Sequence, residues 1–141
     1  MKKNCILIIE SDYYKDIATN LRIGAENVLK KSNFDYEIVT VPGSLEIPVT
    51  LEKYKNLFMG YIILGCVIRG ETTHYDIVTK ITSSSIFESV RRNKIPLGFG
   101  LITAENIKQA NDRSNLKKRN LGTNAAEVCI KMIKILEEKK E

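Results

Sequence analysis

Four apolar runs rich in β-branched residues constrain the fold of this chain more than any other feature of the sequence. The runs are CILII at 5–9, YEIVTV at 36–41, YIILGCVI at 61–68 and IPLGFGLIT at 95–103. None shows the clean apolar-polar alternation of a strand with one face in water, so we expect strands that are covered on both faces. Helical patterns lie between the runs, and strands that alternate with helices form right-handed crossovers and a parallel sheet. The sequence therefore predicts an α/β fold, a three-layer αβα sandwich around a four-stranded parallel sheet.

The helices are predicted from apolar residues that recur every three or four positions. Two long helices follow the first and third runs. The apolar positions of the helix after the first run are Ile17, Leu21, Ala25, Val28 and Leu29. Those of the helix after the third run are Ile77, Ile81, Ile86 and Val90. We predict a shorter helix within 47–56, another at 107–112 and, after a basic loop, a last helix with Ala126, Ile130, Ile133 and Leu136 on its buried side.

Length, charge and cysteine content limit the classes of protein that fit. With 141 residues and 43% hydrophobic content, we expect a single domain over 1–141. No apolar run reaches the roughly 18 residues of a spanning helix, and the first run is too short for a signal peptide, so we expect a cytoplasmic protein with no membrane partner. Three widely spaced cysteines predict no disulfide framework and no metal site. The net charge of +5 suits an anionic small-molecule substrate, and without a reader motif we expect no nucleic acid partner.

The segments that follow the four runs form the candidate site, because ligands of parallel α/β sheets bind beyond the carboxyl ends of the strands. These segments are 10–14, 42–46, 69–74 and 103–106. They carry an aromatic pair, a Gly-Ser turn with a carboxylate, a Gly-Glu-Thr-Thr turn and the only histidine of the chain. The first of them, ESDYY, would repel a phosphate, which argues against a flavin-binding phosphate loop after the first run.

His74 stands at the start of a predicted helix. Gly70 permits a tight turn and Thr72 or Thr73 can cap the helix, so free N–H groups and the positive dipole end can bind a phosphate there. The simpler alternative is that the threonines only cap the helix. The positive end also disfavours the imidazolium form, so His74 should be a neutral ring that can take or give a proton; the alternative is a structural hydrogen bond.

Four other residues each have a functional and a structural interpretation. Glu46, after a Pro-Gly turn, can accept hydrogen bonds from a polyol or a ring N–H, or it can be an ordinary first-turn helix acid. Tyr13 can stack on a flat ring or belong to the rim of the core. Phe99 by itself indicates core, and Arg113 can bind a phosphate or stay solvated.

Three stretches together resemble the 6,7-dimethyl-8-ribityllumazine synthase family. They are VPGSLEIP, GCVIRGETTHYD and PLGFGLITAENIKQANDR, and the likeness extends from Cys5 to the last helix. The resemblance implies a flavodoxin-like fold and a transferase of riboflavin biosynthesis. That enzyme condenses 5-amino-6-(D-ribitylamino)uracil with 3,4-dihydroxy-2-butanone 4-phosphate and releases phosphate and water, with no cofactor expected. The competing hypothesis is a non-catalytic lumazine-binding or shell-forming protein with the same fold.

The resemblance also implies roles for individual residues. His74 would transfer protons. The pyrimidine and its ribityl chain would be bound by Tyr13, Ser44, Leu45, Glu46, Cys66, Val67, Ile68 and Phe99, and the butanone phosphate by Glu71, Thr72 and Arg113. Phe99 and Arg113 would come from a neighbouring subunit, since the family's sites lie between the subunits of a homo-pentamer. Riboflavin synthase would be the downstream enzyme.

Four positions depart from the family's pattern. Leu45 stands where an aromatic residue is usual, so a stacking contact is lost or reduced. Leu121 replaces a common lysine, Asn124 a common acid and Asp12 a frequent arginine, and we expect no ligand contact from Leu121 or Asn124. Few residues precede the first strand and could add to a neighbour's sheet, so we expect a bare pentamer rather than a decamer or a 60-subunit shell.

Overall fold

Four parallel strands form the centre of the protein. The computed structural model describes residues 3–70 and 74–137. The strands are β1 (Cys5–Ser11), β2 (Asp35–Val41), β3 (Gly60–Ile68) and β4 (Leu97–Ala104), and their order in the sheet is β2-β1-β3-β4. In the register of the sheet, Ile8 of β1 lies opposite Ile38 of β2 on one side and Ile62 of β3 on the other. Ile62 in turn lies opposite Gly98 of β4. All four carboxyl ends therefore meet at one edge of the sheet.

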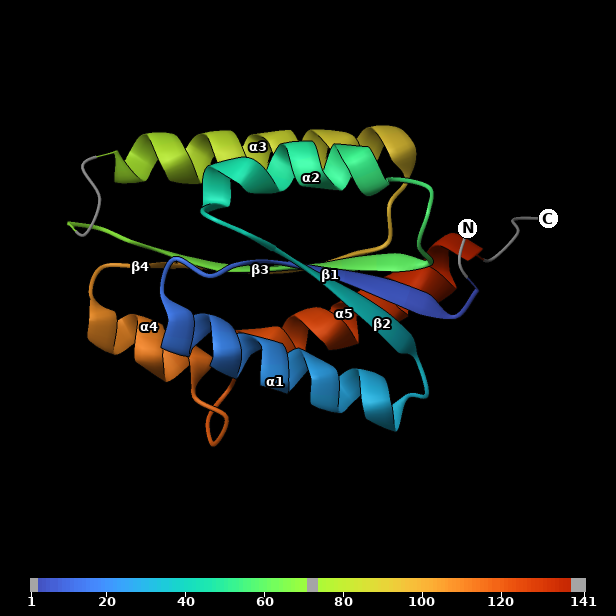
Figure 1. Ribbon diagram of the computed structural model, residues 1–141, viewed down its shortest axis with the longest axis horizontal. Coiled ribbons are helices and arrows are strands. Elements are labelled where there is room, and N and C mark those ends of the chain that lie inside the picture. The colour runs from blue at the N-terminus through green and yellow to red at the C-terminus, as the bar shows by residue number, and fades with distance from the viewer. Residues whose placement is uncertain (1–2, 71–73, 138–141) are drawn as a thin grey trace.

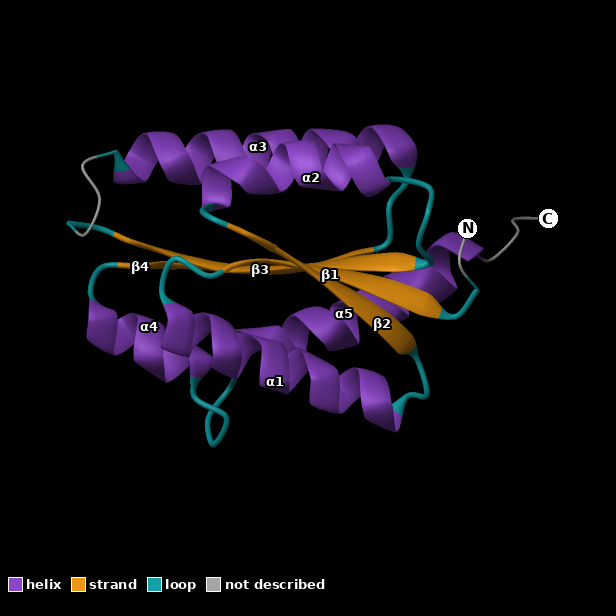
Figure 2. Ribbon diagram, in the orientation of Figure 1, coloured by secondary structure: helices purple, strands orange, loops and turns teal. Residues whose placement is uncertain are grey.

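Helices cover both faces of this sheet (Figure 1). One layer contains α2 (Ile47–Tyr54) and α3 (Tyr75–Asn93), with the short 3-10 helix η1 (Ser44–Glu46) leading into α2. The other contains α1 (Lys15–Lys31), α4 (Ile107–Ser114) and α5 (Leu121–Glu137). Figure 2 shows the two helix layers on either side of the strands. The predicted α/β fold, with a four-stranded parallel sheet flanked by helices, is confirmed.

Each central strand contributes to two hydrophobic cores, because successive side chains of a strand point to opposite faces. Ile6 and Ile8 pack in the core beneath α1 and α5, whereas Leu7 and Ile9 pack beneath α2 and α3. β1 and β3 are buried at every position, as predicted for strands covered on both faces. Within the described ranges, we find no helix long and apolar enough to cross a membrane.

The edge strand β2 departs from the prediction. Of its residues only Val41 is buried, so the expectation that all four runs are covered on both faces is wrong here. The physical reason is the placement of the helices, since α1, α2 and α3 pack mainly over β1 and β3.

Helix positions were predicted better than helix faces. Ile77 and Ile81 of α3 and Leu136 of α5 were expected on buried sides, yet they are 54%, 51% and 41% exposed. α3 buries Thr82 and, as predicted, Ile86. The buried side of α5 is confirmed at Ala126 and Ile133, so apolar spacing identified the side of α5 in large part and that of α3 only in part.

Candidate functional site

An open groove lies at the carboxyl edge of the sheet, where β1, β2 and β3 end. Its volume is about 420 Å³, and its walls are Tyr13, Tyr14, Gly43, Ser44, Leu45, Glu46, Cys66, Val67, Ile68 and Val78. Every residue expected to bind the pyrimidine and ribityl chain is among them except Phe99. Parallel topology thus brings together residues that are more than fifty positions apart in the sequence.

The outer walls of the groove are an aromatic ring and a short turn. Tyr13 is 66% exposed, and its ring meets the edge of Tyr14 with centroids 5.0 Å apart. In the turn, the Glu46 N–H donates to the Gly43 carbonyl at 3.2 Å, Ser44 is buried and Leu45 is exposed. A planar ligand could therefore stack on Tyr13 while its polar edge faces the turn.

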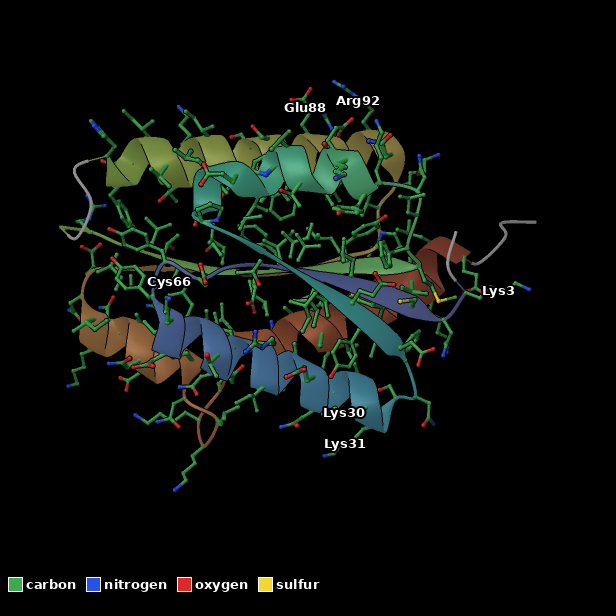
Figure 3. All side chains as sticks on the ribbon, in the orientation of Figure 1. Lys3, Lys30, Lys31, Cys66, Glu88 and Arg92 are labelled. Carbon is green, nitrogen blue, oxygen red and sulfur yellow. The ribbon has the colours of Figure 1, made fainter. Side chains whose placement is uncertain are left out.

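The inner wall is the end of β3. Cys66, Val67 and Ile68 are all buried, and Figure 3 shows Cys66 close to this end of the sheet. Burial raises the pKa of the Cys66 thiol to about 12, and the positive charge of Arg113 acts in the opposite direction. Since the thiolate is the nucleophilic form, this wall is neutral at physiological pH and Cys66 is not an activated nucleophile.

His74 lies directly before α3 as its N-cap residue, so its predicted place at a helix start is confirmed. The His74 carbonyl accepts a hydrogen bond from the Val78 N–H at 2.8 Å, and Val78 lines the groove one turn further on. His74 itself is exposed, on the turn of α3 that begins beside the groove. The predicted caps Thr72 and Thr73, and Glu71 with Thr72 as phosphate ligands, lie outside the described residues.

Phe99 and Arg113 are not brought to the groove of their own chain. The Phe99 ring packs against Phe87 of α3, with centroids 4.9 Å apart. Arg113 is exposed on α4 and donates from Nη1 to the Thr103 carbonyl at 2.7 Å. Neither residue lines the groove, although the charge of Arg113 reaches Cys66 in its inner wall.

Glu10 corrects the interpretation of the segment after the first run. Glu10 and Ser11 belong to β1, and Glu10 is buried. Its Oε2 atom accepts hydrogen bonds from Arg22 at 3.0 Å and from Thr40 at 2.9 Å. The charge of Glu10 is therefore turned inward and paired, and the predicted repulsion of a phosphate by ESDYY depends on Asp12, which follows β1.

The sequence interpretation placed Tyr14 in the segment after the first run without a role, and it missed one wall of the groove, Val78. Val78 follows His74 by one helical turn, and that spacing could have identified it. Over the described ranges, no three His, Cys, Asp or Glu side chains cluster as they would to bind a metal ion. Cys5, Cys66 and Cys129 are buried and form no disulfide with one another.

Comparisons with known proteins agree with the motifs. The family model described as 6,7-dimethyl-8-ribityllumazine synthase matches residues 3–137. Three proteins with that name are similar to this chain. The one from Bartonella bacilliformis is 42% identical over 91% of this chain and 87% of its own length. The one from Beijerinckia indica is 38% identical over 94% of this chain and 75% of its own length. The one from Agrobacterium fabrum is 34% identical over 96% of this chain and 96% of its own length.

Proposed function

This chain belongs to the 6,7-dimethyl-8-ribityllumazine synthase family, and we propose that its reaction takes place in the groove at the carboxyl edge of the sheet. The protein is a transferase of riboflavin biosynthesis. It condenses 5-amino-6-(D-ribitylamino)uracil with 3,4-dihydroxy-2-butanone 4-phosphate to give 6,7-dimethyl-8-ribityllumazine, phosphate and water. The observation that carries the proposed site is the convergence of Tyr13, the turn 44–46 and the strand end 66–68 on one groove. The non-catalytic alternative is not adopted.

The groove residues suit the pyrimidine substrate. The exposed face of Tyr13 stacks on the ring, and backbone groups of Cys66, Val67 and Ile68 bind its polar edge. Ser44 donates hydrogen bonds to the ribityl hydroxyls and accepts from them, the Glu46 carboxylate accepts from them, and Leu45 gives an apolar contact. The neutral thiol of Cys66 supports a packing role in this wall rather than a covalent one.

The second substrate and the proton transfers are assigned to the segment between β3 and α3. Glu71 and Thr72 bind the butanone phosphate, together with Arg113 of a neighbouring subunit. His74 moves the protons required by Schiff-base formation, phosphate loss and ring closure. Bringing two substrates together can supply roughly 7 to 11 kcal/mol at best, and general acid-base catalysis about 10² to 10⁴-fold.

We assign the active form to a cytoplasmic homo-pentamer with sites between subunits, whose product passes to riboflavin synthase. Two observations support a neighbour on this side. Phe99 and Arg113 lie outside their own groove, and η1, α2 and α3 carry five exposed apolar side chains: Leu45, Val49, Ile77, Ile81 and Phe87. Exposed apolar surface of this kind is typical of an interface. Light scattering should give five times the chain mass, and a monomer would contradict the assignment.

The role of His74 is tested by mixing the purified protein with both substrates and following lumazine absorbance. We expect His74→Ala to lower kcat about 10- to 10³-fold and to leave measurable activity, because substrate positioning persists without the proton carrier. Arg92→Met, on the solvent side of the same helix, is the control and should keep the wild-type rate. A wild-type rate in His74→Ala would refute the role.

A further inference from the structure

Arg69, the residue directly after β3, makes contacts in three directions. Its backbone N–H donates to the Ala104 carbonyl at 2.8 Å and so continues the ladder between β3 and β4. Its Nε atom lies 3.0 Å from Glu105 Oε2, and its Nη2 atom lies 3.5 Å from Asp76 Oδ1. The guanidinium carbon is 4.5 Å from the centroid of the Tyr75 ring. One side chain thus contacts two carboxylates and an aromatic face.

The partner on the β4 side is itself held in place. The Glu105 N–H donates to Gln109 Oε1 at 2.8 Å, and the Gln109 N–H donates to Asn106 Oδ1 at 2.9 Å. These two bonds fix the start of α4, whose N-cap residue is Asn106. Glu105 therefore offers Arg69 a carboxylate whose backbone position is set by the start of α4.

The partners on the α3 side adjoin the catalytic candidate. Tyr75 and Asp76 are the first two residues of α3, directly after His74. The His74 backbone is not helical, with φ −125° and ψ 37°, so the direction of its side chain depends on how the first turn of α3 is held. Arg69 links that turn to the β4–α4 junction.

An arginine suits this place better than a lysine. Single exposed ion pairs contribute little to stability, and Arg69 is half exposed. The planar guanidinium, however, can bind both carboxylates and lie against the ring of Tyr75 at the same time, which a point-like ammonium cannot. Its contribution is therefore to orientation rather than to the free energy of unfolding.

We propose that Arg69 is a positioning residue of the reaction, which orients His74 by holding the first turn of α3 against Glu105. This inference rests on the proposed role of His74 and extends it to a residue that contacts neither substrate. Displacement of a catalytic group by about 1 Å can lower a rate by up to about 10²-fold, so the effect on turnover exceeds the effect on stability.

The first test compares Arg69→Met, Arg69→Lys and Glu105→Gln with the control Arg92→Met. Arg92 also pairs with a carboxylate, Glu88, but both point away from the sheet on the outer side of α3 (Figure 3). We expect Arg69→Met to lower kcat about 5- to 50-fold and to keep the KM of the pyrimidine substrate within about twofold of the wild-type value. The kcat values of Arg69→Lys and Glu105→Gln should lie between those of Arg69→Met and wild type. Arg92→Met should behave as wild type.

The second test asks whether Arg69 acts through His74. The double variant Arg69→Met/His74→Ala should be no slower than His74→Ala, because the group to be positioned is already gone. His74 is the only histidine, so one ring Cε1–H resonance reports its surroundings. This resonance should shift in Arg69→Met and not in Arg92→Met, while circular dichroism shows both to be folded.

Two results would overturn the proposal. One is a double variant whose losses multiply, and the other is an Arg69→Met protein with unchanged kcat and a raised KM for the butanone phosphate, which would make Arg69 a substrate ligand. Wild-type turnover in His74→Ala would instead overturn the proposed function of His74. A slow His74→Ala beside an unimpaired Arg69→Met would remove only the inference about Arg69.

Discussion

The two helix layers of the protein differ in how closely their helices pack. In the layer of α1, α4 and α5, which we name the closed layer, a Cβ atom at Gly122 would lie 1.9 Å from the Leu21 carbonyl, so α1 and α5 pack backbone to backbone. In the layer of η1, α2 and α3, the open layer, Val49 and Ile77 are 69% and 54% exposed. Both layers leave apolar side chains exposed, Ile135 of α5 among them, so the contrast lies in the close backbone contact between α1 and α5.

Polar groups follow the same division. In the closed layer, the buried Asn120 side chain donates to the Asn20 carbonyl at 3.1 Å and to the Ser114 carbonyl at 2.7 Å. In the open layer, the buried hydroxyls of Thr79 and Thr82 have no hydrogen-bond partner in the part of the chain described. The difference teaches that a buried amide links the helices of the closed layer, whereas two buried hydroxyls of the open layer have no such bond among the described residues. The groove takes its walls from both sides of the sheet, since Tyr14 leads into α1 and Val78 belongs to α3.

The largest effect should come from filling the close contact in the closed layer. Gly122→Ala places a methyl group against the backbone of α1, which cannot yield as a flexible side chain can, so we expect the free energy of unfolding to fall by about 3 kcal/mol. Urea denaturation at fixed protein concentration measures it. Gly43→Ala is the open-layer control, because the added Cβ atom would meet only the end of the Glu46 side chain, at 3.1 Å. Its free energy of unfolding should fall by about 1 kcal/mol or less. Equal losses in the two variants would remove the contrast.

Breaking the open layer should abolish assembly rather than folding. Ile81→Glu places a charge on an exposed apolar position of α3, and burying that charge in an interface without a partner is costly. We expect light scattering to show a folded monomer, with activity lowered at least about 10-fold because Phe99 and Arg113 of the neighbour are lost. Ile135→Glu, on α5 of the closed layer, is 49% exposed and should leave assembly intact. An Ile81→Glu pentamer would contradict the proposed interface.

Alkaline pH should weaken the folded state through two buried thiols, Cys66 and Cys129, both in the core beneath the closed layer. Burial raises the pKa of Cys66 and of Cys129 from 9.0 to about 12. Above pH 9 the unfolded chain releases these protons and the folded protein does not, so the thiols have no effect below about pH 9 and lower stability between pH 9 and 12. Between pH 9 and 12, the melting temperature of Cys129→Ala should fall less steeply with pH than that of wild type. If the two plots of melting temperature against pH were parallel, Cys129 would have the same pKa in the folded and the unfolded protein.

The smallest effect should come from restoring a ring to the groove. Leu45→Phe supplies a second aromatic face beside Tyr13, and such contacts contribute about 0.5 to 1.5 kcal/mol. We therefore expect the KM of the pyrimidine substrate to fall about two- to tenfold. Leu116→Phe, at an equally exposed position outside the groove, should leave KM unchanged. An unchanged KM in Leu45→Phe would show that residue 45 does not contact the ring.

Much of the fold and most of the groove could be predicted from local patterns. The apolar runs gave all four strands, and helical spacing gave the five α-helices, because burial on a regular backbone imposes a period on the sequence. Tyr13, Ser44 and Glu46 were predicted to share one edge because parallel strands point the same way, and the family resemblance added Cys66. Val78 was missed because the prediction stopped at the start of the helix, although the one-turn spacing from His74 points to the same side.

The sequence by itself determined the order of strands and helices, the edge of the sheet that carries the site and the family to which the chain belongs. Only the tertiary structure decided that Glu10 turns inward to Arg22, that β2 is left partly uncovered and that Ile81 faces outward. It alone brought Arg69 to Asp76 and Glu105. The reason is physical: periodicity is a property of neighbours along the chain, whereas burial and pairing depend on which distant segments the folded backbone places side by side.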